Sequence, residues 1–187
     1  MTGELQREKA AYYFSLIDED DNKFIEADDF EMRADRLAEA RGVTDPEAQA
    51  DIRDQVMNWW RHLCNVADVD DDGQVTQREW QRYWQGIQAA VEEGGEASEA
   101  VLEGLERAAR ATFRSMKVDD GDQVTQDEYA DWLAAWGVDD AEAPFERLDR
   151  DDTGGLTEDD LVQAVREFYL SNDPDAPGNV LYGELPE

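Results

Sequence analysis

The segment from Asp68 to Glu79 constrains this chain more strongly than any other. It reads Asp-Val-Asp-Asp-Asp-Gly-Gln-Val-Thr-Gln-Arg-Glu, which matches the spacing D-x-D-x-D-G-x5-E of a calcium loop between two helices. Calcium takes about six to eight oxygen ligands, and a short loop can bring them to one point. The expected ligands are Asp68, Asp70, Asp72, the Gln74 carbonyl, Thr76 and Glu79.

An acidic chain could produce such a string by chance, or as a loop that only interacts with water. The other positions of the segment argue against both explanations. Gly73 stands where the loop must turn sharply with a positive φ, and Val75 is suited to a short strand that pairs with a second loop. Apolar residues precede and follow the loop at helical spacing, among them Trp59, Trp60 and Trp84. We therefore expect a helix–loop–helix calcium site.

A second loop of this kind spans residues 18–29 and follows an amphipathic helix expected over residues 4–17. Lys23 replaces the glycine, so a non-glycine residue must adopt positive φ at a cost of about 1–2 kcal/mol. Asp29 replaces the closing glutamate and is one methylene shorter. The loop is still expected to bind a metal ion, through Asp18, Asp20, Asn22, the Phe24 carbonyl, Glu26 and Asp29.

The loop at residues 149–160 has its turn glycine in place, at Gly154, but again closes with an aspartate. Only three carboxylates point inward, so its affinity should be below that of loop 68–79. Its expected ligands are Asp149, Asp151, Thr153, the Gly155 carbonyl, Thr157 and Asp160.

The loop at residues 117–128 departs furthest from the pattern. Lys117 puts an ammonium in the first ligand position, and Gly121 removes the fifth ligand. Moving the start of the loop to Asp119 would misplace both Val124 and the closing Glu128. We expect a loop kept for pairing, without a tight calcium site.

The four loops define four repeats of one unit, each of which needs a partner to cover its apolar face. We expect Ile25 to pair with Val75, and Val124 with Leu156, as short antiparallel strands. The polar segment 92–98 is the expected boundary between two halves. The predicted fold is all-α, with a pair of units in residues 1–93, another pair in residues 99–171, and a tail in residues 172–187.

The charge of the chain limits its partners. Its 48 acidic and 17 basic residues give a formal net charge of -31, which repels nucleic acids and anionic membranes and favours cations. No segment is apolar and long enough to span a bilayer, and residues 1–8 resemble no secretory signal, so we expect a cytoplasmic protein. The single cysteine, Cys64, excludes an internal disulfide and is expected to pack in the core.

The loops, the long first spacing and the tail D-P-x-A-P-G-N-x-L-x-G at residues 173–183 resemble the EF-hand family, and within it the sarcoplasmic calcium-binding proteins and their bacterial calerythrin-like members. This resemblance covers nearly the whole chain. It implies one compact monomer in which two EF-hand pairs face each other. It also implies that the tail folds back on the body, for which Val180, Leu181 and Tyr182 are suitable anchors.

The expected function is calcium buffering or transport, with about three Ca²⁺ bound through loops 18–29, 68–79 and 149–160. Mg²⁺ is an expected competitor at the two loops that close with aspartate, because a monodentate ligand suits six-fold coordination. Two alternatives are a calcium sensor that opens an apolar groove to a protein target and a carrier of a small hydrophobic ligand. A sensor groove is often rich in methionine, whereas only Met32, Met57 and Met116 lie within this chain. An enzyme is not expected, because the lone His62 has no nucleophile–base partner in the sequence.

Overall fold

Helices and loops alternate along the protein, whose computed structural model describes residues 3–118 and 121–186. Residues 1–2 of the expected first pair, Asp119 and Asp120 of the third loop, and Glu187 of the tail lie outside this description. The elements are α1 (Glu4–Ile17), β1 (Phe24–Ile25), α2 (Ala27–Ala40), α3 (Pro46–Ala67), β2 (Val75–Thr76), α4 (Gln77–Glu93), α5 (Gly95–Met116), α6 (Gln126–Ala134), α7 (Glu142–Leu148), α8 (Glu158–Leu170) and the 3-10 helix η1 (Pro177–Val180). The mostly helical fold expected from the sequence is confirmed.

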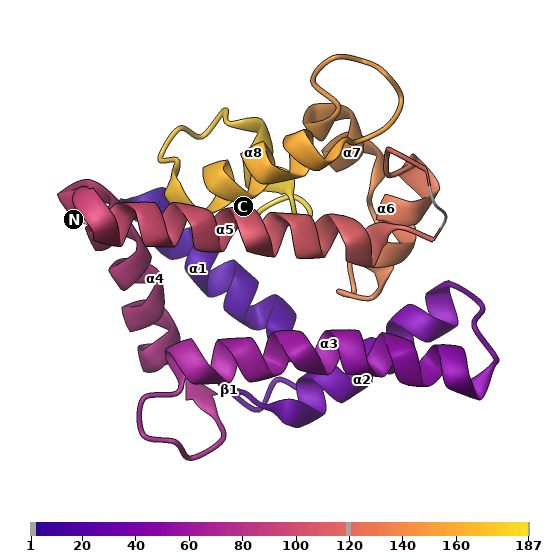
Figure 1. Cartoon of the computed structure of the whole chain (residues 1–187), viewed down its shortest axis with the longest axis horizontal. Coiled ribbons are helices and arrows are strands. Elements are labelled where there is room, and N and C mark those ends of the chain that lie inside the picture. The colour runs from indigo at the N-terminus through magenta and orange to yellow at the C-terminus, as the bar shows by residue number, and fades with distance from the viewer. Residues whose placement is uncertain (1–2, 119–120, 187) are drawn as a thin grey trace.

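Local sequence signals set the helix ends. The Asp45 side chain accepts hydrogen bonds from the N–H groups of Glu47 and Ala48, at 3.1 and 3.0 Å, and Pro46 takes the first position of α3. Gly94, with a φ of 78°, separates α4 from α5. Figure 1 shows α3 and α5 extending across the molecule, with α4 joining them at one end. Within the described residues, no helix has both the length and the apolar character needed to cross a bilayer.

Both predicted pairings between loops are present. β1 and β2 are antiparallel, with Ile25 opposite Val75. Val124 and Leu156 form a single antiparallel bridge, in which each N–H donates to the other's carbonyl at 2.8 and 2.9 Å. The four loops are therefore joined two by two, as the sequence predicts.

A continuous aromatic core joins the two halves. Tyr13 of α1 is 3% exposed and lies at its centre. Its ring centroid is 5.6 Å from that of Trp80 in α4, 5.5 Å from that of Trp136 after α6, and 5.6 Å from that of Phe168 in α8. Tyr182 of the tail is closer still, at 4.2 Å. Since these rings come from both pairs of helix–loop–helix units and from the tail, opening one pair would disturb packing in the other.

The tail is held by hydrogen bonds as well as by packing. The Tyr13 hydroxyl donates to the Tyr182 hydroxyl at 2.9 Å, and the Tyr12 hydroxyl donates to the Tyr182 carbonyl at 2.9 Å. The Tyr129 hydroxyl donates to the Leu181 carbonyl at 3.0 Å. Gly178 lies so close to α8 that a Cβ there would be 2.4 Å from the Ala164 carbonyl oxygen. The tail therefore forms part of the packed body.

Candidate metal centres

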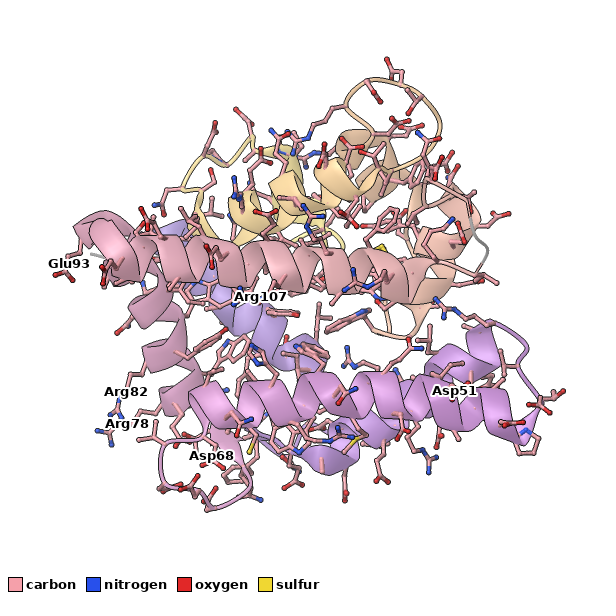
Figure 2. All side chains as sticks on the ribbon, viewed as in Figure 1. Asp51, Asp68, Arg78, Arg82, Glu93 and Arg107 are labelled. Atoms are coloured by element: carbon pink, nitrogen blue, oxygen red, sulfur yellow. The ribbon has the colours of Figure 1, made fainter. Side chains whose placement is uncertain are left out.

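The second loop, residues 68–79, brings three carboxylates together. Asp68 directly follows the last residue of α3, and Glu79 lies in the first turn of α4. Asp68, Asp70 and Glu79 each offer an oxygen, and the three oxygens lie within 4.8 Å of one another. Figure 2 labels Asp68 in the lower left corner of the view, the corner in which Arg78 and Arg82 are also labelled. This arrangement has the ligand type and the spacing that a hard dication requires.

The hydrogen bonding of the two Asp68 oxygens indicates whether this loop suits a cation. Oδ2 accepts hydrogen bonds from the Gly73 N–H at 3.0 Å and the Cys64 thiol at 3.4 Å. Oδ1 is buried, and no hydrogen-bond partner for it occurs among the described residues. An unpaired buried carboxylate oxygen is costly, and a bound cation would remove that cost. The donor set therefore fits calcium.

The closing residue of this loop is already oriented. Glu79 Oε1 accepts from the Val69 N–H at 3.0 Å, and Oε2 accepts from the Thr76 N–H at 2.9 Å. The bond from Thr76 is the main reason that the pKa of Glu79 is lowered, so the carboxylate stays ionised. Repulsion from Asp72 raises the pKa of Asp70. A cation among these groups would offset that repulsion.

The first loop has the same hydrogen-bonding pattern as the second, although Lys23 and Asp29 depart from the calcium-loop sequence. Lys23 adopts the predicted positive φ, at 78°. Asp29 Oδ1 accepts from the Glu19 N–H and Oδ2 from the Glu26 N–H, both at 2.8 Å, so the shorter side chain makes the contacts that Glu79 makes in the second loop. Asp29 is 1% exposed, and burial raises its pKa to about 6.

Most of the remaining expected ligands of the first loop gather around the same point. Oxygens of Asp18, Asp20 and Asp29 lie within 4.8 Å of one another. The Asn22 side-chain amide bridges Asp20 Oδ2, at 3.1 Å, and Glu26 Oε1, at 2.9 Å. Phe24 lies in β1, where strand pairing holds its backbone.

The fourth loop is more open. Asp149 accepts hydrogen bonds from the N–H groups of Thr153 and Gly154, at 3.1 and 2.8 Å. Asp160 Oδ2 accepts from the Thr157 N–H at 2.8 Å. Among the described residues, close groups of three acids form in the first two loops, whereas Asp149, Asp151 and Asp160 form no such group. The fourth loop has the expected turn but a looser set of carboxylates.

The third loop is the one expected to lack a tight site, and its first ligand position is filled by Lys117. The lysine side chain lies inside the loop and is only 9% exposed. Val118 N–H donates to Glu128 Oε1 at 2.7 Å, as the corresponding residues do in the first two loops. The closing Glu128 thus makes the same contact with the second residue of its loop as Asp29 and Glu79 make in theirs.

The sequence analysis did not predict that two glutamine side chains, Gln74 and Gln123, would form hydrogen bonds between paired loops. The Gln74 side-chain amide donates to Glu26 Oε2 at 2.7 Å, which links the first two loops through an expected ligand. The Gln123 amide donates to Thr153 Oγ1 at 3.2 Å and to the Gly155 carbonyl at 3.3 Å in the fourth loop. The repeat Gln-Val-Thr-Gln at residues 74–77 and 123–126 was the available signal.

Cys64 packs against the core, as expected, but it is less buried than a core residue. It is half-buried and packs against the edge of the core, and its thiol contacts Asp68, because the last turn of α3 lies at the surface beside the second loop.

Comparison with known proteins gives one clear set of relatives. Calerythrin of Saccharopolyspora erythraea is 30% identical over 173 residues, which cover 91% of this chain and 95% of calerythrin. A sarcoplasmic calcium-binding protein from amphioxus has a TM-score of 0.68 at 19% identity, with both chains covered fully. The coelenterazine-binding protein of Renilla muelleri has a TM-score of 0.76 at 18% identity, with 97% of this chain and 96% of that chain covered. No protein-family model matches the chain.

Proposed function

We propose that this chain, which belongs to the EF-hand family of calerythrin and the sarcoplasmic calcium-binding proteins, is a calcium buffer. In this proposal about three Ca²⁺ bind, through the loops at residues 18–29, 68–79 and 149–160. The observation that carries it is the buried, unpartnered oxygen of Asp68 within the close group of Asp68, Asp70 and Glu79.

The driving force for uptake is electrostatic. Each loop holds several carboxylates that repel one another, and the chain carries a net charge of -31. Each ion adds two positive charges, so three ions would bring the net charge to about -25. Binding therefore stabilises the folded chain, because the unfolded chain lacks the assembled ligands.

The core favours a buffer over a sensor. A sensor must expose apolar surface when it binds calcium. Here the rings around Tyr13 belong to both EF-hand pairs and the tail, so the pairs cannot open independently. The exposed large hydrophobic residues of the described part are Val66, Val69 and Val118.

One surface feature supports the sensor as the second candidate. A hollow of about 360 Å³ lies between the end of α3, α4 and the start of α5. Val66, Val69, Ile87 and Val101 line it, and Glu79 of the second loop lies at its edge. Calcium binding could change this hollow through Glu79, so the two functions need a direct test.

Titration of calcium into the metal-free protein with a hydrophobic dye separates the two functions. We expect dye fluorescence to start high and fall, because calcium closes a loosened core. Addition of a chelator should reverse the fall. A rise in fluorescence with calcium would contradict the buffer and support a sensor.

We also propose that magnesium competes at the first and fourth loops, where the closing residue is an aspartate. D29E and D160E should each raise the preference for calcium over magnesium about 10-fold at the altered loop, because the longer side chain can bind with both oxygens. The reverse change, E79D, is the matched control and should move the second loop toward magnesium. Competition titrations measure both changes. Unchanged preferences in D29E and D160E would contradict the proposal.

A further inference from the structure

The third loop contains a cation of its own. Lys117 follows the last residue of α5, and its side chain turns into the loop. Its Nζ donates a hydrogen bond to the Gln123 carbonyl at 2.6 Å and lies 3.6 Å from Glu128 Oε1. The Glu128 side chain is only 10% exposed, so this contact is largely shielded from water.

Gln123 and Glu128, which the ammonium contacts within the described residues, have counterparts in the other loops. Gln123 is the seventh residue of its loop, as Gln74 is of the second, and the carbonyl of this residue is an expected calcium ligand. Glu128 is the closing residue, as Glu79 is. We propose that the Lys117 ammonium takes the place of a calcium ion in the third loop and holds it closed without metal.

Simple chemistry supports this role. An ammonium donates up to three hydrogen bonds, and oxygen atoms arranged for a cation are suitable acceptors. Lys117 also lies at the C-terminal end of α5, where the helix dipole favours positive charge. The ammonium is covalently attached, so the third loop should stay closed at every calcium concentration.

The closed third loop acts on the fourth. Lys117 binds the backbone carbonyl of Gln123, and the side chain of Gln123 donates to Thr153 and Gly155 in the fourth loop. The next residue, Val124, forms the bridge to Leu156. The fourth loop is therefore paired with residues that the Lys117 ammonium positions before any ion arrives. This last step rests on the proposed function, because it concerns calcium binding by the fourth loop.

The first experiment compares K117M with R114M in the presence of a chelator. Both substitutions remove one positive charge at the C-terminal end of α5, but Arg114 is exposed in the last turn of the helix. We expect K117M to lower the melting temperature by roughly 5 °C and R114M to leave it nearly unchanged. Equal melting temperatures for the two variants would overturn the inference.

The second experiment restores carboxylates at the first and fifth ligand positions of the loop with the double variant K117D/G121D. We expect this variant to bind one more calcium ion than the wild type, measured by calorimetry at about 1 mM calcium, and calcium to restore the stability that it lacks in chelator. No additional ion in K117D/G121D would show that Lys117 does not occupy an ion position. If the wild type itself binds no calcium, the proposed function fails, and the chelator comparison of K117M with R114M still decides the role of the ammonium.

Discussion

Removal of calcium should lower the melting temperature of this protein by roughly 30 °C. An ion present at about 1,000 times its dissociation constant adds about 4 kcal/mol to the free energy of unfolding. For a chain of this size, each kcal/mol shifts the melting temperature by about 2–4 °C. Three ions therefore give an effect of this order.

The structure explains why the metal-free form should be weak. Asp18, Asp20 and Asp29 lie within 4.8 Å of one another, as do Asp68, Asp70 and Glu79. Without a cation these carboxylates repel one another, and their repulsion adds to that of the whole acidic chain. Thermal melting followed by circular dichroism, in about 1 mM calcium and then in chelator, measures the shift. A shift below about 5 °C would contradict tight binding at three loops.

E79Q should weaken calcium binding at the second loop by about 100-fold or more, and one ion per chain should be lost at micromolar calcium. The substitution removes a charge and prevents ligation through two carboxylate oxygens. Glu79 also orients the loop, since it accepts hydrogen bonds from Val69 and Thr76. Both the charge and the loop geometry are therefore affected.

The matched control is E128Q, which alters the same position of the third loop. Glu128 makes the same backbone contacts, to Val118 and Thr125, but its loop holds Lys117 at the first ligand position. E128Q should therefore leave the number of bound ions unchanged, although it should reduce stability. Calorimetric ion counts of both variants test the pair of predictions. Loss of an ion in E128Q, or none in E79Q, would contradict the assignment of the loops.

The loops were predictable because their geometry is local. Within one loop, each ligand position is only a few residues from the next, so the spacing of the acids determines which side chains point inward. For the same reason, the positive φ of Lys23 followed from the pattern alone. The pairing of Ile25 with Val75 joins two loops, and it was predictable because each unit has one apolar residue at the same loop position and needs a partner. Local capping likewise determined where α3 begins, at Asp45 and Pro46.

The same spacing did not determine how tightly a loop closes. Asp29 and Asp160 are both closing aspartates, yet Asp29 accepts hydrogen bonds on both oxygens and belongs to a close group of acids. Asp160 belongs to no such group among the described residues. In the fourth loop, Arg150 pairs with Glu167 of α8 at 2.8 Å, and Glu167 also accepts from the Gly178 N–H of the tail. Contacts between a loop, a distant helix and the tail cannot be inferred from the spacing of residues within the loop.

The sequence by itself predicted four repeated helix–loop–helix units and the positive φ of Lys23, because these features depend on neighbours along the chain. It also predicted which loops pair, because each unit carries an apolar residue at the same position of its loop. Only the tertiary structure decided that Tyr13 packs on Tyr182, 169 residues away, and that Gln74 and Gln123 reach into sister loops. It also decided that the Lys117 ammonium turns inward onto Gln123 and Glu128. These contacts join distant segments, and they form only when the whole core is packed.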